Sequence, residues 1–285
     1  MPEINRLNLT AARCRRNVLR MLEASGHGHM GGALSCIDIV TALYFYKMNI
    51  SPEDPKKEDR DRFLLSAGHK CLAQYAVLAE RGYFDKSILD TYGGLHTKIP
   101  GHPDMHKLPG VEANTGALGH GLSIASGMAL SLRSDGKPSK VYVVMGDGEL
   151  AEGSNWEAAA AAAHYGLDNL VVFVDFNGLQ ISGKVTEIMN YTPIADHFKA
   201  FGWATADIDG NNMQEIVDTL DSLPLEKGKP SLIVAHTVKG KGISFEENKV
   251  SSHYWSPGEE ELQRAIQEIE ENIRQLEKLC GEEAI

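Results

Sequence analysis

The segment Lys140-Val141-Tyr142-Val143-Val144-Met145-Gly146-Asp147-Gly148-Glu149 indicates the fold more directly than any other part of the sequence. Residues 140–145, with the apolar run 141–145 and its three β-branched valines, predict a buried strand, and Gly-Asp-Gly follows directly at the carboxyl end. Asp147 is therefore expected at the edge where open α/β sheets bind ligands. Taken alone, a Gly-Asp-Gly turn is a weak signal, because ordinary tight turns use the same residues.

A second strand with a polar end strengthens this interpretation. Residues 170–175 form another apolar run, which leads into Phe176-Asn177-Gly178-Leu179. Neighbouring parallel strands joined by one helix bring their carboxyl ends side by side. The Asp147 carboxylate, the Asn177 side-chain carbonyl and the Leu179 backbone carbonyl are then hard oxygen ligands suited to one Mg²⁺ ion.

Strand-like and helix-like segments alternate along the chain. Further strands are predicted at 63–65, 204–208 and 231–236, and helices at 154–167, 194–201 and 213–220. This order predicts an α/β fold with a mostly parallel central sheet and helices on both faces, as one domain over residues 1–285. Amphipathic helices are expected to flank it at the N-terminus and at about 257–279. The second of these is interpreted as a packed surface helix, with docking onto a partner chain as the alternative.

Composition excludes several function classes. The formal net charge of −11 argues against sequence-independent nucleic-acid binding. No apolar run is long enough for a membrane span, which needs about 20 residues. The four cysteines, Cys14, Cys36, Cys71 and Cys280, form no CxxC pair. Buried free thiols in a reducing cytoplasm are therefore expected, with neither nucleic acid nor a membrane as partner.

The histidines cluster in the first half of the chain. Seven of the eleven lie between His27 and His120, and none has the HExxH spacing of a zinc site. A dinucleotide fingerprint is not supported either, because Gly26-His27-Gly28 follows a predicted helix and not a strand.

Several of these histidines lie in motifs that resemble one family. Gly28-His29-Met30-Gly31-Gly32 is similar to the GHPGG segment of transketolases, and Leu65-Ser66-Ala67-Gly68-His69 to their strand-then-GH motif. Gly101-His102-Pro103 resembles their GHP motif, and residues 111–119 their VExxTGxLG motif. Together with the Gly-Asp-Gly and Asn-Gly motifs, these follow the family order from about residue 20 to 245. The chain thus resembles the N-terminal half of a transketolase, whose diphosphate-binding domain has the thiamine-diphosphate-binding fold.

The resemblance implies a cofactor, a metal and a role for each matching residue. Thiamine diphosphate would bind with Mg²⁺, for which Ca²⁺ or Mn²⁺ can substitute. The implied metal ligands are Asp147, Asn177 and Leu179. The implied cofactor contacts are His69, Gly116, Leu118, Gly148, Asn177 and His253. The implied catalytic, substrate-facing residues are His29, His102 and His253, with His27 as a second candidate.

Three positions depart from the family pattern. Met30 stands where the family has Pro, and His120 where Gln is common. Tyr254-Trp255 follows His253 where the family typically has Gly. This last departure bears on substrate preference more than on cofactor binding.

The acids after the Gly-Asp-Gly turn have two interpretations. Glu152 and Glu157 lie near the start of a predicted helix, where the macrodipole alone favours acids. In transketolases, matching acids lie between the two active sites of the dimer. Because only one α/β domain is predicted, the chain is expected to need a separate C-terminal transketolase subunit, in an α2β2 heterotetramer.

The leading functional prediction is transfer of a two-carbon ketol unit from a ketose phosphate to an aldose phosphate, as in the pentose phosphate pathway. A transketolase-like enzyme for a sulfonated or branched sugar is one alternative. The α subunit of a 2-oxo acid dehydrogenase or decarboxylase is a second, and a non-catalytic pseudo-subunit is a third. The His69 and His102 motifs disfavour the oxo-acid enzyme.

Overall fold

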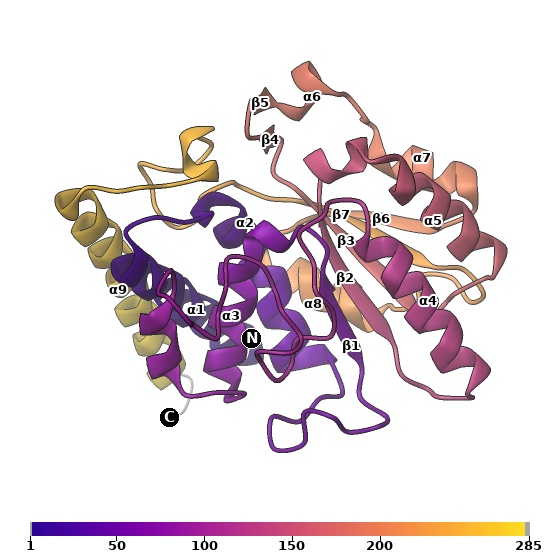
Figure 1. The fold of residues 1–285 in the computed structure, drawn as a ribbon, viewed down its shortest axis with the longest axis horizontal. Coiled ribbons are helices and arrows are strands. Elements are labelled where there is room, and N and C mark those ends of the chain that lie inside the picture. The colour runs from indigo at the N-terminus through magenta and orange to yellow at the C-terminus, as the bar shows by residue number, and fades with distance from the viewer. Residues whose placement is uncertain (1, 283–285) are drawn as a thin grey trace.

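The computed structural model describes residues 2–282 and contains a five-stranded parallel sheet with helices on both faces (Figure 1). The strand order is β1-β2-β3-β7-β6, so every carboxyl end lies at the same edge. The strands are β1 (Arg62–Leu65), β2 (Val141–Gly146), β3 (Leu170–Phe176), β6 (Ala204–Asp209) and β7 (Ser231–His236). All five predicted strands, and the α/β fold class, are confirmed.

Alternate residues of the strands face two separate apolar layers. Tyr142 and Val144 of β2 belong to one core cluster, and Val141 and Val143 to the other. Alternation of this kind follows from the two-residue period of a strand. The first layer contains α1 (Pro2–Ser25), α2 (Met30–Ala42), α3 (Cys71–Arg81) and α8 (Met213–Asp221), and the second contains α4 (Gly121–Ser134), α5 (Gly153–His164) and α7 (Ile194–Phe201).

The C-terminal helix α9 (Glu259–Glu282) lies along α1, as Figure 1 shows. Ala265, Ile266 and Ile269 are buried in the first core layer. The prediction of a packed surface helix is therefore confirmed. Ion pairs from Arg13 to Glu277 and from Arg16 to Glu270 tie the exposed edges of the two helices.

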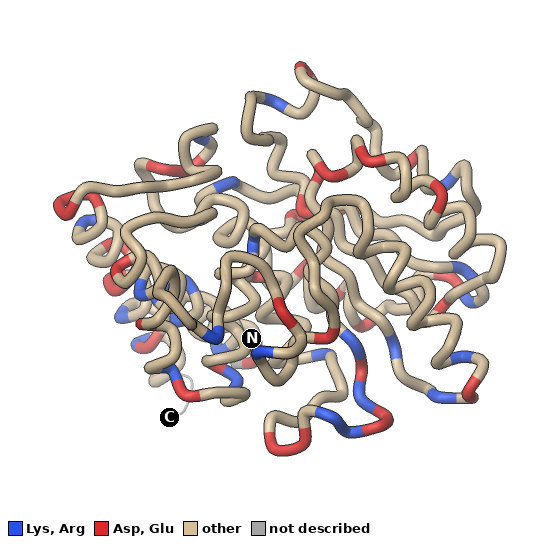
Figure 2. The backbone as a smooth tube through the Cα atoms, in the orientation of Figure 1, with Lys and Arg blue, Asp and Glu red and all other residues tan. Residues whose placement is uncertain are grey.

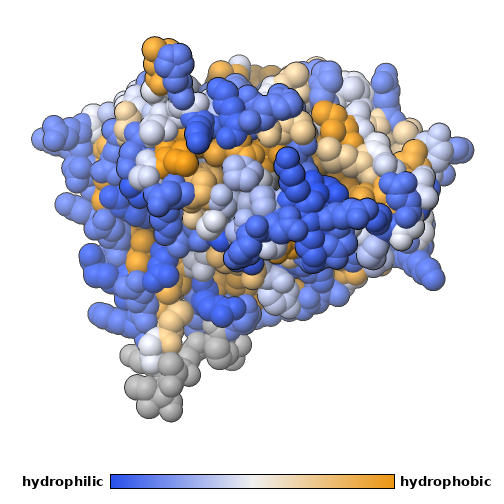
Figure 3. All heavy atoms as spheres, turned by 60° about the horizontal axis from the view of Figure 1, so that its bottom comes forward, coloured by the Kyte–Doolittle hydropathy of each residue, from blue (hydrophilic) through white to orange (hydrophobic). Residues whose placement is uncertain are grey.

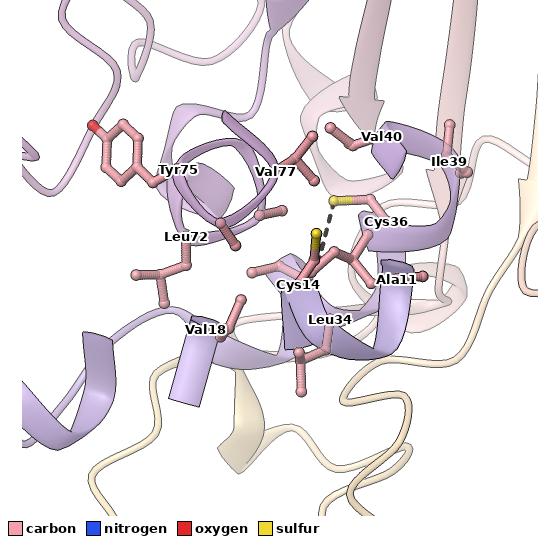
Figure 4. Close-up of a cluster of buried hydrophobic side chains, with 14 of the residues drawn as sticks. Ala11, Cys14, Val18, Leu34, Cys36, Ile39, Val40, Leu72, Tyr75 and Val77 are labelled. Atoms are coloured by element: carbon pink, nitrogen blue, oxygen red, sulfur yellow. Dashed lines mark hydrogen bonds between the residues drawn. The ribbon is translucent and has the colours of Figure 1, made fainter. Parts of the chain in front are cut away.

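Three of the cysteines are buried free thiols, as predicted. Cys14 and Cys36 lie among apolar side chains of α1, α2 and α3 (Figure 4). Cys71 begins α3 and is equally buried. Burial raises the pKa of Cys36 and of Cys71 to about 12, so these thiols stay protonated and unreactive.

Charged residues of both signs are interspersed over the outer helices and loops (Figure 2). On the face in Figure 3, apolar residues form separate patches within a mostly hydrophilic surface. None of the helices described here combines the length and apolar character that crossing a membrane requires.

Several short elements were not predicted. The hairpin of β4 (Leu179–Gln180) and β5 (Gly183–Lys184), with α6 (Val185–Ile188), projects beyond the carboxyl edge of the sheet (Figure 1). A π-helical turn spans Leu43–Lys47. Short 3₁₀ turns span Gly68–Lys70, Lys86–Thr91, Gly148–Ala151 and Ser251–His253.

Candidate active site

A cavity of about 300 Å³ opens at the carboxyl ends of β2 and β3. Most of the residues that the sequence predicted for the site line it. These are His29, His69, Gly116, Leu118, Asp147, Gly148, Asn177, Leu179 and His253. They come from six segments of the chain, and the parallel sheet brings the strand-end members together.

Asp147 lies at the centre of the cavity floor, directly after β2. Its Oδ1 accepts a hydrogen bond from the Gly148 amide and its Oδ2 one from the Gly178 amide, both at 2.7 Å. Burial raises the pKa of Asp147 to about 6, against the opposing effect of the nearby Lys70 ammonium. Two backbone bonds thus fix the carboxylate and leave lone pairs on both oxygens for a cation.

A buried network that the sequence did not predict sets the orientation of Asn177. Asp175, at the end of β3, is fully buried and accepts from Lys70 Nζ at 2.5 Å and from Ser35 Oγ at 2.6 Å. It also accepts from the Thr237 hydroxyl. Asn177 Nδ2 lies 3.3 Å from the same Asp175 carboxylate, so Asn177 Oδ1 points the other way and accepts from the Leu179 amide at 3.1 Å. The orientation of the Asn177 side chain in the cavity lining is therefore fixed by hydrogen bonds at both ends of its amide group.

Lys239 is a second unpredicted residue of the cavity. Its Nζ donates to the Leu179 carbonyl at 2.9 Å and lies 3.1 Å from His253 Nδ1. Burial, followed by repulsion from Lys70, lowers the pKa of Lys239 to about 8. The Leu179 carbonyl, which was predicted from the sequence to be a metal ligand, is thus already in contact with the Lys239 ammonium group.

Three imidazoles form the opposite wall. The ring centroids of His29, His69 and His253 lie 5.3–5.4 Å from one another. Burial lowers the pKa of all three, to about 4 for His253, and repulsion from neighbouring cationic groups adds to the effect. All three rings are therefore neutral at pH 7, and each offers one N–H donor and one ring-nitrogen acceptor.

Other predicted residues lie outside the cavity lining. His102 is exposed, and its ring packs against Gly116, where a Cβ would stand 2.8 Å from His102 Cδ2. Glu152 and Glu157 are exposed near and on α5. Gly148 does line the cavity, but its amide, expected to contact the cofactor, donates to Asp147.

Glu149, the first acid after the Gly-Asp-Gly turn, is a structural residue. It is buried and accepts from Ser66 Oγ at 2.5 Å, from the Gly119 amide at 2.9 Å and from the Gly146 amide at 3.2 Å. Burial raises the pKa of Glu149. One carboxylate thus joins the ends of β1 and β2 to the loop that precedes α4.

The donor atoms fit a hard divalent cation. Within residues 2–282, no group of three or more His, Cys, Asp or Glu could hold a metal. A carboxylate, an amide oxygen and a backbone carbonyl nevertheless meet at Asp147, Asn177 and Leu179, and Mg²⁺ prefers oxygen ligands and keeps waters or phosphate oxygens for the rest. The Leu179 carbonyl has a second lone pair besides the one that faces Lys239.

Comparison with known proteins agrees with this geometry. Residues 8–272 match the family described as "Transketolase, thiamine diphosphate binding domain". An apulose-4-phosphate transketolase subunit from Phocaeicola vulgatus is 41% identical over 97% of this chain and 98% of its own length. A 6-deoxy-6-sulfo-D-fructose transketolase subunit from a Clostridium species is 44% identical over 89% of this chain and 94% of its own length.

Solved structures give the same result. Transketolase from Campylobacter jejuni superposes with a TM-score of 0.85 at 30% identity, over 95% of this chain. Transketolase from Leishmania mexicana also gives 0.85, at 27% identity over 97% of this chain. The chain spans 45% of the length of each of these two proteins.

Proposed function

Because the chain belongs to the transketolase family, we propose that it is the thiamine-diphosphate-binding subunit of a two-chain transketolase. The complete enzyme would move a two-carbon ketol unit from a ketose phosphate to an aldose phosphate. The observation that carries the proposal is the cavity in which Asp147 and Asn177 face three neutral imidazoles. The two relatives of similar length are named as transketolase subunits, which supports the two-chain assignment.

The charges of the cavity support a metal-dependent cofactor. The ammonium groups of Lys70 and Lys239 and the carboxylates of Asp147 and Glu149 line the cavity. Asp175, buried behind the lining, pairs with Lys70, so the formal sum of these five groups is −1. An anionic diphosphate would be repelled from such a floor without a divalent cation. Asp147, Asn177 and Leu179 would hold Mg²⁺, and the Lys239 ammonium would contact a diphosphate oxygen.

The histidines would then carry the proton transfers of the reaction. When bound, thiamine diphosphate supplies the carbanion chemistry that a protein side chain cannot. His29 and His253 face the same cavity as neutral imidazoles, each able to donate to a substrate oxygen or to accept its proton. Burial lowers the pKa of His69 further than that of His253, and His69 would hold a diphosphate oxygen. His102, which is exposed and packs against Gly116, would hydrogen-bond the C1 hydroxyl of the donor sugar.

A partner chain would complete the site. Glu152 directly precedes α5 and Glu157 lies on α5. Both are exposed, so they could contact a second chain in an α2β2 assembly. The small side chains Ala160 and Ala161 of α5 are exposed on the same helix, which allows another backbone to approach closely.

An unusual sugar is the second candidate substrate. The two similar subunits are named for apulose 4-phosphate and for 6-deoxy-6-sulfo-D-fructose. The Tyr254 departure lies next to His29 of the cavity lining, with ring centroids 4.9 Å apart. A substrate outside the common ketose phosphates is therefore included in the test.

The test is co-expression with the product of the neighbouring reading frame, followed by co-purification. The complex is assayed with Mg²⁺, thiamine diphosphate and a panel of linear, branched and sulfonated ketose donors with an aldose phosphate acceptor. Ketol transfer by the complex, with none by either chain alone, is the expected result. Turnover by the purified chain alone would refute the two-chain assignment, and pyruvate decarboxylation would favour the oxo-acid enzyme.

A further inference from the structure

Tyr254 lies beside the histidine cluster because its neighbours on both sides are anchored. Trp255 is 5% exposed and belongs to the main core cluster. Its amide donates to the Gly28 carbonyl at 2.9 Å, and the Gly28 amide donates to the Trp255 carbonyl at 3.0 Å. On the other side, Ser252 is fully buried against Gly31, where a Cβ would stand 2.5 Å from Ser252 Oγ.

Between these two anchors, the His253 side chain lines the cavity and the Tyr254 side chain stays exposed. His253 ends the 3₁₀ turn Ser251–His253, and Tyr254 follows it with extended dihedral angles. His253 turns into the cavity, where it meets Lys239. Tyr254 remains 48% exposed and packs with its ring edge-to-face against His29, at a centroid distance of 4.9 Å and an interplanar angle of 77°.

His27 braces Tyr254 from the outer side. The two rings stack at 5.4 Å with an interplanar angle of 28°, and the Tyr254 hydroxyl lies 2.6 Å from His27 Nδ1. His27 is itself fixed, because Ser25 Oγ donates to the His27 carbonyl at 2.7 Å. The rings therefore form a continuous series from the half-buried His69 through His29 to the exposed Tyr254 and His27.

We infer that Tyr254 is a specificity-determining residue that forms the outer wall of the substrate entrance beside His29. An aromatic face and one hydroxyl suit the uncharged, hydroxylated carbons of a sugar, whose C–H groups can pack on the ring. The charged end of the substrate is then placed away from Tyr254. Because Trp255 fixes the backbone beside Tyr254 and His27 stacks on the ring, the wall is rigid, and it rejects a sugar that is longer or branched at this point.

The inference rests on the proposed ketol transfer. The cofactor dissociation constant, the His27 ¹⁵N shifts and calorimetric donor affinities keep the two separable, because none of these three readouts needs turnover. The complex with the partner chain, saturated with thiamine diphosphate and Mg²⁺, is assayed with five-, six- and seven-carbon ketose phosphates. The Y254G variant is expected to raise kcat/KM for the seven-carbon donor relative to the five-carbon donor by about tenfold, the size typical of a changed steric contact in a pocket. A ratio that stays within twofold of wild type overturns the inference.

Two further variants distinguish the loss of the Tyr254 ring from a general folding defect. Y254F keeps the ring but removes the hydroxyl, so it is expected to change KM while leaving the donor ratio near wild type. Y46F removes a comparable exposed hydrogen bond, from Tyr46 to Asp221, and serves as the matched control with no change in either quantity. If the cofactor dissociation constant rises more than about threefold in Y254G, Tyr254 supports the structure of the cofactor site, and the inference is contradicted.

The Tyr254–His27 contact is also measurable without turnover. The imidazole ¹⁵N shifts of His27 are expected to change between wild type and Y254F, because Nδ1 loses its partner. Identical shifts contradict the bracing contact. If the wild-type complex turns over none of the donors, the proposed function fails. The same donor ratio, measured as dissociation constants by calorimetry, then decides whether Tyr254 sets specificity.

Discussion

Replacing Asp175 by asparagine tests whether the floor of the cavity depends on one buried ion pair. The Asp175 side chain is fully buried and the Lys70 side chain is 4% exposed, with 2.5 Å between Nζ and Oδ2. Removing one partner of such a pair costs about 3–5 kcal/mol, because the other charge stays buried. With a urea slope of about 3 kcal/mol/M for a chain of this size, the unfolding midpoint of D175N should fall by at least about 1 M. A shift below about 0.3 M would refute the reasoning.

A double-mutant cycle isolates the pair itself. K70M keeps the stem that packs on Gly32 and removes the charge, so K70M/D175N leaves no buried ion. The double variant should be more stable than the sum of the two single losses predicts, by about 2 kcal/mol. K137M breaks the exposed Lys137–Glu58 pair and should leave the free energy of unfolding nearly unchanged. Additive losses in the cycle would show that Lys70 and Asp175 are not coupled.

Three other outcomes are expected. Because the pKa of Lys239 is lowered to about 8, its ammonium is lost as the pH rises above 8. Calorimetry should therefore show thiamine diphosphate affinity falling from pH 8 to 9.5 in wild type but not in K239R, and a flat wild-type profile would exclude the contact. D147A should abolish Mg²⁺-dependent cofactor binding, whereas D209A, at the same sheet edge but outside the cavity lining, should not; unchanged affinity in D147A would sink the metal assignment. G119A combines a φ of 82° with a Cβ 2.5 Å from a neighbouring side chain, so its melting temperature should fall by about 5 °C or more. G136A has a similar φ but open space and should fall by less; equal losses would mean that the close contact is unimportant.

The sequence predicted the sheet well because its strands are signalled locally. Residues 141–146 and 170–174 are continuous apolar runs with both faces buried, as expected for parallel strands between helices. The polar residues that end them then follow from topology alone. Asp147 and Asn177 could be placed together without any structure, because adjacent parallel strands share an edge.

The residues that the sequence missed act over long distances in the chain. Lys70 pairs with Asp175, more than a hundred positions later, and Ser35 reaches the same carboxylate. A lysine before the apolar α3 and an aspartate inside the apolar β3 were the available signals, since buried charges are normally paired. Lys239 gave no such signal, because its burial depends on where the chain runs after β7.

The floor and the histidine wall of the cavity differ in how their polar groups are satisfied. Both oxygens of Asp147 have backbone partners, and Asp175 has several side-chain partners, all within this chain. Among the described residues, the His29 and His69 imidazoles contact other rings but make no hydrogen bond. Since buried polar groups are normally paired, these imidazoles are the groups that a substrate or cofactor would satisfy. The polar groups of Asp147 and Asp175 are therefore satisfied within this chain, whereas the His29 and His69 imidazoles are left for what binds in the cavity.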